Sequence, residues 1–359
     1  MRIAVISTPV FPCPPVGYSG LEFLAWQQAK GLAAKGHQVA LFAPDGSHCE
    51  GAVIVPIGPP GSWNEKQAYG KYWQHLLGPN GEDAFDVIID NSWQKWAFSL
   101  KLEGRIKAPL LAVCHAPVNT MHQSLPDPGM VSFVCISKDQ ASHFEALFSR
   151  ECRYVYNGVD TSFYQPLNVP RTNRFLFLAR FSTIKGPLLA IEACKAAGVG
   201  LDLIGDTSIT NEPEYLEKCK RACDGKQIRL IGPATRSECV YWFSQAHCLL
   251  HPNFPAPKLG HPGFREPFGL APVEAQLCGT LVIAGNFGAC RETIKHGETG
   301  WIVKSMDDLI ETIKIFGGEV GFRKERRERC REWASQFSIE AMVSGYEKLC
   351  QEAIQTGGW

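Results

Sequence analysis

Short apolar segments alternate with longer amphipathic segments through the first half of the chain. The apolar segments are rich in β-branched residues, which is typical of parallel strands buried on both faces. The segment LEFLAWQQAKGLAAKGH follows the first of them and ends near a glycine suited to stopping a helix. The predicted strands are RIAVIS, QVALFAP, DVIID, PLLAVCHA and VSFVCIS. This order predicts an α/β domain in which helices connect parallel strands.

The same alternation starts again in the second half, with predicted strands RFLFLAR, GLDLIGD, QIRLIG, AHCLLHP and GTLVIAG. A chain of 359 residues is longer than one hydrophobic core usually serves, so we expect two doubly wound domains. A stretch containing Pro and Asn, 166–173, separates the two series and sets the boundary. The first domain is predicted at residues 1–165 and the second at 166–337. A final helix, at about 338–359, fits either domain on pattern alone.

Composition narrows the class of protein. Lys plus Arg equals Asp plus Glu, at 36 each, so we expect no nucleic-acid partner. No apolar stretch is long enough to cross a bilayer, while contact with a membrane surface through a local basic patch stays open. The 14 cysteines include no CxxC pair and no other metal spacing. Without an export signal at the start, they predict free thiols in a cytoplasmic protein that binds no metal.

Two loops of the first domain carry candidate binding residues, because ligands of open parallel sheets bind beyond the carboxyl ends of the strands. The loop TPVFPCPPVGYSGLE follows the first strand, and its Gly17 and Gly20 would let the backbone approach a phosphate or a sugar closely. Any strand-to-helix loop can be rich in glycine, so this signal is weak. His115 follows the strand PLLAVC, where a histidine either packs in the core or faces a ligand.

Two cations follow the strand RFLFLAR in the second domain. Arg180 and Lys185 lie on one loop at the predicted start of a helix. In that position they would bind a diphosphate and counter the negative charge that grows on it when a bond to it breaks. Two independent surface cations are the alternative.

The segment REPFGLAPVEAQLCGTLVIAG places Glu266 and Glu274 on either side of a short turn at Gly269, with a helix predicted to start near Pro272. Carboxylates accept hydrogen bonds from sugar hydroxyls strongly, and Glu274 in the first helical turn would accept from both hydroxyls of a ribose. The backbone N–H groups at the helix start also favour a charged ligand; they belong to Phe268, Gly269 and Leu270. Ordinary helix-start chemistry explains the same residues without a ligand.

The longer segment EPFGLAPVEAQLCGTLVIAGNFGACRETIKHGETGWIV resembles the signature region of retaining glycosyltransferases of family 4, with its paired glutamates. The resemblance implies the GT-B architecture, in which two Rossmann-like domains face each other across a cleft. The first domain would bind the acceptor and the second a nucleoside-diphosphate sugar. The final helix, at about 338–359, would pack back on the first domain. The implied enzyme, of EC class 2.4, transfers the sugar to an acceptor hydroxyl by attack on the same face, with the departing phosphate assisting deprotonation. It would need no metal or other cofactor.

The resemblance also implies roles for individual residues. His115 would lie beside the donor sugar, Arg180 and Lys185 would bind the diphosphate, and backbone groups at Ile231 and Gly232 would edge the nucleobase. The glycine-rich loop of the first domain departs from the family, because Ser19 stands where a second adjacent glycine is common. We therefore count Gly17, Ser19 and Gly20 as donor-binding candidates.

A second departure is a Pro-rich insertion at about 252–265, which would shape the donor pocket, cover the cleft or form a surface excursion. Its Lys258 and His261 carry no assigned role.

Two other functions share this architecture. One is a nucleotide-sugar epimerase, and the other is a non-catalytic nucleotide-sugar binding protein. A phosphorylase would need a lysine-bearing pyridoxal phosphate segment that we do not find in the sequence. The base and sugar of the donor, the acceptor and the oligomeric state cannot be read from the chain.

Overall fold

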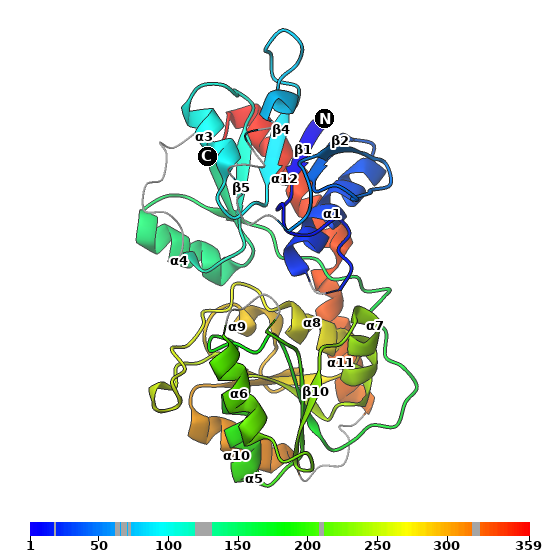
Figure 1. The fold of residues 1–359 in the computed structure, drawn as a ribbon, viewed down its shortest axis with the longest axis vertical. Helices are drawn as coiled ribbons and strands as arrows, with labels where there is room; N and C mark the ends of the chain where they lie inside the picture. Colours follow the sequence, from blue (N-terminus) through cyan, green and yellow to red (C-terminus); the bar gives the residue numbers. More distant parts are fainter. Residues whose placement is uncertain are drawn as a thin grey trace. The chain divides into compact units, whose positions relative to one another are not determined.

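The computed structural model describes residues 1–17, 19–61, 65, 70, 73–118, 131–207, 212–317 and 324–359. The chain divides into two compact units (Figure 1). The first comprises Met1–Gly158 and Ser338–Trp359, and the second comprises Val159–Phe337.

The first unit is built on a parallel sheet with the strand order β3-β2-β1-β4-β5-β6-β7. Its interior contains apolar side chains from neighbouring strands, such as Ile6, Phe42 and Ile88. The strands are β1 (Arg2–Ile6), β2 (Gln38–Ala43), β3 (Ala52–Pro56), β4 (Val87–Asp90), β5 (Leu110–Cys114), β6 (Ser132–Cys135) and β7 (Arg153–Tyr154). The helices whose bounds lie within the described ranges are α1 (Gly20–Ala34), η1 (Trp73–Leu76), α3 (Trp96–Leu102), α4 (Lys138–Phe148) and α12 (Ile339–Thr356).

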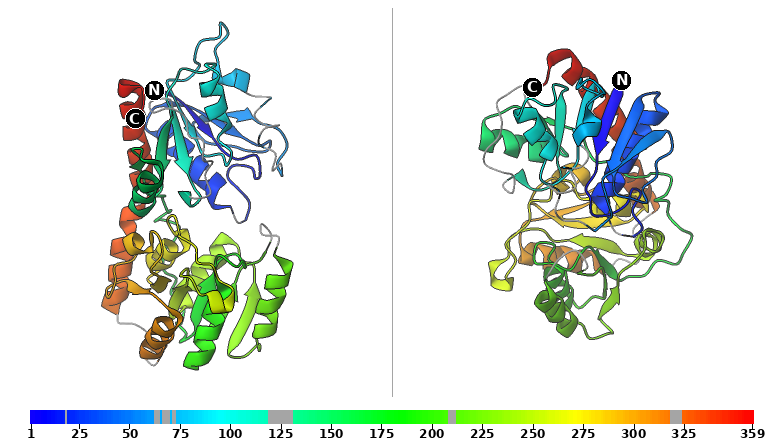
Figure 2. Two further views of the ribbon diagram at one scale, coloured as in Figure 1. Left: turned by 90° about the vertical axis from the view of Figure 1, so that its left-hand side faces the viewer. Right: turned by 45° about the horizontal axis from the view of Figure 1, so that its top comes forward.

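Helix α12, the last in the chain, packs against α1 in the first unit (Figure 2). Gly31 makes the close approach possible, because a Cβ at this position would lie 2.4 Å from the side chain of Val343. Glu347 of α12 then forms ion pairs with Lys35, at 2.7 Å, and with His37, at 3.0 Å. The C-terminal segment is thus an integral part of the first unit.

The second unit is built on a parallel sheet with the strand order β10-β9-β8-β11-β12-β13. The strands are β8 (Phe175–Leu178), β9 (Leu201–Ile204), β10 (Ile228–Gly232), β11 (Cys248–His251), β12 (Leu281–Gly285) and β13 (Gly300–Val303). Its helices are α5 (Pro187–Ala197), α6 (Pro213–Ala222), α7 (Arg236–Gln245), η3 (Pro257–Leu259), α8 (Leu270–Leu277), α9 (Cys290–Thr293), α10 (Met306–Gly317), α11 (Lys324–Ala334) and η4 (Ser335–Phe337). Helix α5 packs against α6 and α10, and α8 packs against α7 and α11 (Figure 1).

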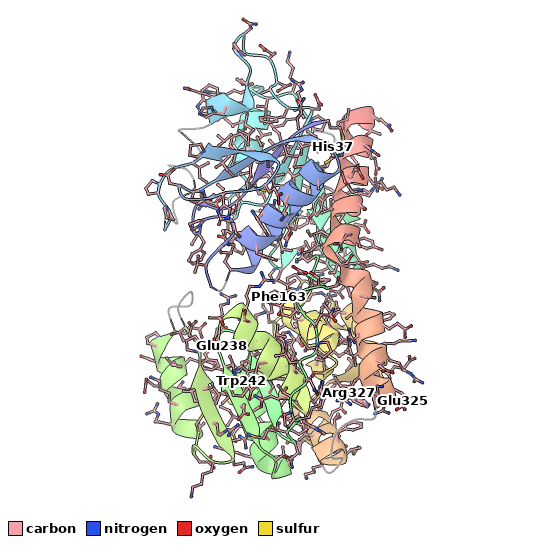
Figure 3. All side chains as sticks on the ribbon, turned by 90° about the vertical axis from the view of Figure 1, so that its right-hand side faces the viewer. His37, Phe163, Glu238, Trp242, Glu325 and Arg327 are labelled. Carbon is pink, nitrogen blue, oxygen red and sulfur yellow. The ribbon has the colours of Figure 1, made fainter. Side chains whose placement is uncertain are left out.

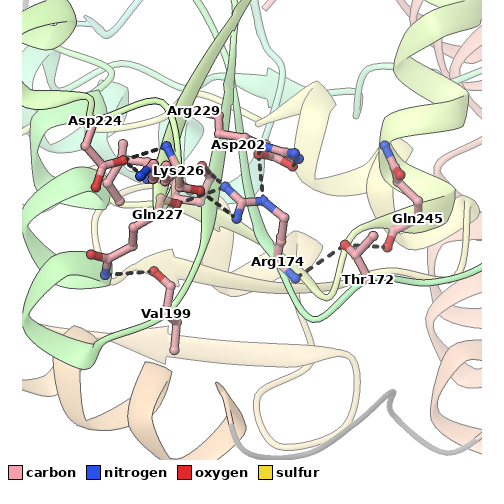
Figure 4. Close-up of polar contacts among 11 residues, drawn as sticks. Thr172, Arg174, Val199, Asp202, Asp224, Lys226, Gln227, Arg229 and Gln245 are labelled. Atoms are coloured by element: carbon pink, nitrogen blue, oxygen red, sulfur yellow. Dashed lines mark hydrogen bonds and ion pairs between the residues drawn. The ribbon is translucent and has the colours of Figure 1, made fainter.

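An ionic network joins three adjacent strands of this sheet (Figure 4). Asp202 of β9 accepts hydrogen bonds from Arg174, at 2.8 Å, and from Arg229 of β10, at 2.6 and 2.7 Å. Arg174 also donates to the backbone oxygens of Leu201 and Gln227. These groups lie near the amino ends of the strands. The network therefore stabilises the end of the sheet opposite the carboxyl ends, where the site is predicted.

The prediction of parallel α/β sheets is confirmed, and all ten predicted strands are present. Three further strands, β3, β7 and β13, were not predicted. Helix α8 begins at Leu270, not near Pro272, so Glu274 lies in the second helical turn and not in the first. The helix begins earlier because Gly269 has a positive φ of 89° and starts it directly.

Candidate functional site

The strand order of the second unit reverses between β8 and β11, and doubly wound sheets bind ligands beyond the strand ends at this point. The loop after β8 contains Arg180 and Lys185, and β11 ends at His251. The carboxyl ends of adjacent parallel strands lie at the same end of the sheet. The loop that contains Arg180 and Lys185 therefore begins next to His251.

Glu266 connects the two strand ends through its side chain. The ammonium Nζ of Lys185 lies 2.6 Å from Oε2 of Glu266, and Nε2 of His251 lies 3.0 Å from the same oxygen. Burial alone would raise the pKa of Glu266, but the charge of Lys185 and the hydrogen bond from His251 hold that pKa well below its usual range. Glu266 is therefore an ionised carboxylate in a buried position, being only 6% exposed.

The backbone around Glu266 is fixed as well. Its N–H donates to the oxygen of Phe287, at 3.1 Å, and its own oxygen accepts from Ala289, at 2.8 Å. Gly288 is required between them, because a Cβ there would lie 2.4 Å from the oxygen of Glu266. Glu266 thus has little freedom to move away from the strand ends.

Lys185 is placed by the start of α5. Its N–H donates to the oxygen of Ser182, at 3.1 Å, and Gly186 follows with a φ of 69°. A Cβ at Gly186 would lie 2.8 Å from the oxygen of Pro252, so only glycine allows this loop to approach the end of β11. Lys185 Nζ also lies 4.5 Å from the ring centre of Phe264.

Phe264 belongs to the Pro-rich insertion, which is folded against the site. The insertion contains the short helix η3 and an antiparallel bridge between Ala256 and His261. Phe264 N donates to Asn253 O at 2.9 Å, which closes the segment. His261 is buried and its Nδ1 contacts the oxygen of Phe254 at 2.9 Å, whereas Lys258 is exposed. The insertion therefore forms one wall around Lys185.

Among the described residues, Arg180 forms no hydrogen bond or ion pair with this cluster. Its Nε is buried and has no hydrogen-bond partner among the described residues. The two predicted cations therefore differ in their contacts. Lys185 forms an ion pair with Glu266, whereas the buried Nε of Arg180 has no hydrogen-bond partner among the described residues.

Glu274 has its own set of partners. It is partly buried, and Tyr164 and Arg236 are close enough to act on its charge. Burial raises the pKa of Glu274, while these two neighbours partly offset that effect. No contact between Glu266 and Glu274 is seen in the described part of the chain, so the two glutamates are held separately.

The other candidates of the second unit lie in two places. Phe268 is buried and packs edge-on against Phe337, with ring centres 5.7 Å apart, and is followed by Gly269 and by Leu270, the first residue of α8. Ile231 is 42% exposed at the end of β10, next to Gly232, where the register with β9 shifts. This strand end is therefore partly exposed, although the oxygen of Gly232 accepts a hydrogen bond from Gly205 N at 2.9 Å.

In the glycine-rich loop of the first unit, the serine side chain is hydrogen-bonded within the protein. Ser19 precedes α1, and its hydroxyl hydrogen-bonds to Glu22 in the first turn of the helix, as does the hydroxyl of Thr8. Glu22 is 4% exposed, and burial raises its pKa although the Thr8 hydrogen bond acts in the opposite direction. Gly17 has a φ of 91°, and Gly20 is the first residue of α1.

His115 is held as a neutral ring in the first unit. Nδ2 of Asn91 donates to Gln28, so Oδ1 of Asn91 faces Nε2 of His115, at 2.8 Å, and assigns the proton to that nitrogen. Burial, with the charge of Lys95, lowers the pKa of His115 to about 3. Its Nδ1 is buried, has no hydrogen-bond partner among the described residues, and is left as an acceptor.

The residues of these sites that were not predicted include His251, Tyr164, Arg236 and Asn91. A sequence signal exists for His251, which ends the predicted strand AHCLLHP beside the strand that leads to Lys185. The others reach the site through contacts between distant segments, for which the sequence carries no such signal.

Within the described ranges, no group of three or more His, Cys, Asp or Glu side chains is arranged to hold a metal ion. In the same ranges, no helix has the length and apolar character needed to span a membrane.

Comparisons with known proteins agree along almost the whole chain. A family model described as glycosyltransferase family 4 matches residues 18–163, and one described as glycosyl transferases group 1 matches residues 160–337. D-inositol 3-phosphate glycosyltransferase 1 of Catenulispora acidiphila is 24% identical over 416 aligned positions, covering 99% of this chain and 97% of that protein.

Solved structures show the same fold. Sucrose-phosphate synthase from Thermosynechococcus elongatus is similar with a TM-score of 0.79 and 20% identity, over 99% of both chains. The Anabaena protein HepE in complex with UDP is similar with a TM-score of 0.71 and 17% identity, over 98% of this chain and 100% of that chain. The chain therefore belongs to the family 4 (group 1) glycosyltransferases and has their GT-B fold of two Rossmann-like domains.

Proposed function

We propose that this glycosyltransferase takes its sugar from a nucleoside-diphosphate donor and transfers it to an acceptor hydroxyl with retention of configuration. The observation that carries the proposal is the cluster of Lys185, His251 and Glu266 at the strand-order reversal of the second unit. A cation there suits a diphosphate, and a fixed ionised carboxylate suits sugar hydroxyls. On this proposal the second unit binds the donor and the first unit binds the acceptor.

In the proposed reaction the bond between the anomeric carbon and the phosphate oxygen breaks, and its electron pair stays on the phosphate. The acceptor oxygen attacks the anomeric carbon on the same face, and its proton passes to the departing phosphate. Lys185 and Arg180 stabilise the growing negative charge, so that no metal is needed. Lys185 is already held beside the site by Glu266, which limits the reorganisation that donor binding requires.

The remaining candidates position the donor. Glu266 accepts from hydroxyls of the sugar, and Glu274 accepts from the ribose. His115 offers the lone pair of Nδ1 to a sugar hydroxyl and transfers no proton, because its low pKa keeps the ring neutral. Backbone groups complete the donor site; they belong to Gly17, Ser19, Gly20, Ile231, Gly232, Phe268, Gly269 and Leu270.

The test is a transfer assay with a panel of nucleotide sugars, including UDP-glucose, and a panel of acceptors. The acceptors include D-inositol 3-phosphate, the compound in the name of the Catenulispora relative. We expect release of the nucleoside diphosphate that depends on the acceptor, together with a product of retained configuration. Conversion of the donor to its epimer would instead favour an epimerase, and donor binding without turnover would favour a binding protein.

A further inference from the structure

The loop that follows β4 lies at the reversal of strand order in the first unit. Strands β1 and β4 are neighbours in the sheet, and the later strands continue on the far side of β4. Doubly wound sheets bind ligands beyond the carboxyl ends of the strands at such a point. The loop has the sequence NSWQK at residues 91–95. It therefore occupies the position in the first unit at which a ligand is expected.

A buried carboxylate fixes the backbone of this loop. Glu65 is 1% exposed, and its two oxygens accept hydrogen bonds from the backbone N–H groups of Trp93, at 2.9 Å, and Gln94, at 2.6 Å. The N–H of Ser92 donates to Oδ1 of Asp90, at 2.8 Å. Hydrogen bonds to an ionised carboxylate are among the strong ones. The loop is therefore held in one conformation before a ligand arrives.

The end of the loop is strained. Lys95 has a φ of 54°, in the left-handed region that residues with a side chain rarely adopt. Its N–H donates to Oγ of Ser92, and its ammonium donates to the backbone oxygen of Asp90, both at 3.1 Å. Such strain persists only where the surrounding contacts enforce it, and it is concentrated at functional sites.

Trp93 is the large side chain that this rigid loop leaves in water. It is 50% exposed, and among the described residues its indole forms no ring or cation contact. Trp242 of α7, by contrast, is partly buried, and its ring packs against Tyr241 with ring centres 5.7 Å apart (Figure 3). The exposed indole face of Trp93 adds little to the stability of the fold, because that stability comes from apolar area removed from water.

The same loop is joined to the residue that is proposed to lie beside the donor sugar. Oδ1 of Asn91 lies 2.8 Å from Nε2 of His115, and Asn91 stands two residues before Trp93 in the sequence. Gln28 holds Asn91 from the other side, because it accepts from Nδ2 of Asn91 at 2.8 Å. Trp93 is thus anchored near the place to which an acceptor hydroxyl must be brought for transfer.

An exposed indole face suits one chemical class of acceptor. Cyclic polyols, such as pyranoses and cyclitols, carry C–H groups on the faces of a rigid ring and hydroxyls around its rim. A C–H face can pack on an aromatic ring at little cost in conformational entropy, since both partners are rigid. An acyclic polyol has the same hydroxyls but no fixed apolar face, and it loses chain freedom when it binds.

We propose that the acceptor is a cyclic polyol whose ring stacks on the exposed indole of Trp93, which the loop at residues 91–95 holds in place. The inference rests on the proposed function, in which the first unit binds the acceptor. It adds the chemical class of the acceptor and names the side chain that selects it.

The experiment compares cyclic and acyclic acceptors in the transfer assay, with the full chain and the nucleotide sugar that turns over fastest. The cyclic acceptors are methyl α-glucoside, myo-inositol and D-inositol 3-phosphate, and the acyclic ones are sorbitol and glycerol 3-phosphate. We expect the best cyclic acceptor to have a KM at least about tenfold lower than that of either acyclic compound.

Trp93→Leu should raise the KM of this cyclic acceptor by about tenfold or more, with kcat and the Kd of the nucleotide sugar nearly unchanged. Trp93→Phe keeps an aromatic ring and should raise the same KM by about threefold or less. A fluorescence titration gives a second test that needs no donor. The cyclic acceptor should change the tryptophan fluorescence of the wild type but not that of Trp93→Phe.

Tyr154→Leu is the matched control. Tyr154 is another exposed aromatic residue of the first unit, at 42%, and it lies on β7, three strands away from β4 in the sheet. This variant should keep the wild-type KM for every acceptor, so that a general effect of removing a surface ring is separated from an effect at the site.

Four outcomes overturn the inference. Trp93→Leu could keep the wild-type KM, or it could lower kcat and donor affinity to the same extent as acceptor affinity, as a purely structural role predicts. The acyclic compounds could serve as well as the cyclic ones, or none of the cyclic acceptors could be used. Failure of the wild type to bind any nucleotide sugar would instead contradict the proposed function, and the fluorescence titration would still decide whether Trp93 binds a cyclic polyol.

Discussion

The two units share a strand order but place different chemistry at the reversal of that order. In the second unit, Lys185 and His251 surround the ionised carboxylate of Glu266. In the first unit, Glu22 is held by two hydroxyls, and His115 is held neutral by Asn91. The topology therefore fixes where a ligand can bind, and the residues at the strand ends decide its charge. On the proposed function, the second unit binds a diphosphate, whereas the first binds neutral hydroxyl groups.

Glu266 and Glu22, which are both buried, express this difference as opposite pKa shifts. Cationic neighbours lower the pKa of Glu266, whereas burial raises the pKa of Glu22. A carboxylate with a lowered pKa stabilises the fold at neutral pH, and one with a raised pKa destabilises it there. Replacing Glu266 should therefore lower the unfolding free energy at neutral pH, whereas neutralising Glu22 should raise it or leave it unchanged.

The largest effect is expected for Glu266→Ala, which leaves Lys185 and His251 without their shared buried partner. Breaking a buried ion pair in this way costs about 3 kcal/mol of unfolding free energy. The pKa of Glu266 is lower in the folded state than its unfolded value of about 4.3. The contribution of this carboxylate to the unfolding free energy is therefore complete above about pH 4.3 and is lost as the pH falls further. Urea unfolding at several pH values measures the difference between variant and wild type.

Glu298→Ala serves as its control, because Glu298 forms an exposed pair with Lys295, at 2.9 Å. Its loss should cost less than about 0.5 kcal/mol. Equal stabilities of Glu266→Ala and the wild type at pH 7 would contradict our description of the cluster.

Lys185→Ala should lower kcat by about 100-fold or more, since it removes a preorganised charge from the departing diphosphate. Lys195→Ala is the matched variant, because Lys195 lies on the surface of α5 and pairs at 3.9 Å with Glu192. It should leave the rate unchanged. Steady-state kinetics with a productive donor and acceptor make the measurement, and an unaltered rate in Lys185→Ala would remove this residue from leaving-group stabilisation.

His115→Gln tests the neutral ring of the first unit. The folded pKa of about 3 lies below the unfolded value of about 6.5, so the unfolded state binds the proton first as the pH falls. Wild-type stability should therefore decrease by about 1 to 2 kcal/mol between pH 7 and pH 5 because of this residue alone. The variant should lack this part of the decrease. Identical pH profiles of unfolding free energy would show that His115 titrates normally.

Glu22→Gln should have the smallest effect, and in the opposite direction to Glu266→Ala. Glutamine keeps hydrogen-bonding groups for Thr8 and Ser19 but removes the buried charge. Because the folded pKa of Glu22 is raised, wild-type stability falls as the pH rises through the range between the unfolded and folded values. We expect the variant to match or exceed the wild type at pH 7 by up to about 1 kcal/mol.

Glu50→Gln is the control, because Glu50 is exposed. The unfolding free energy of this variant should lie within about 0.5 kcal/mol of the wild type. A clear loss of stability in Glu22→Gln would mean that the carboxylate is ionised and well paired.

The sequence predicts the strands whose side chains are buried on both faces, since such strands are continuous apolar runs. It does not reveal β3, whose side chains are at most partly buried, or β7, which has only two residues. Lys185 and Glu266 were predicted because each lies in a motif next to a strand or a helix start. Their direct ion pair was not predicted, because it joins residues 81 positions apart.

The partners of Glu274 illustrate the same limit. Tyr164 precedes the first strand of the second unit, and Arg236 starts a different helix from Glu274. Only the folding of the unit brings these three side chains together. Local patterns therefore identify residues that carry their own signal, whereas the neighbours of such a residue are set by tertiary packing.

The central claim is that the strand ends of the second unit bind the diphosphate of a nucleotide sugar. Calorimetric titration of UDP, ADP and GDP into the wild type and into Lys185→Ala tests it most directly. We predict that at least one diphosphate binds the wild type and that Lys185→Ala binds it about tenfold or more weakly. No binding to the wild type, or equal affinity in the two proteins, would contradict the claim.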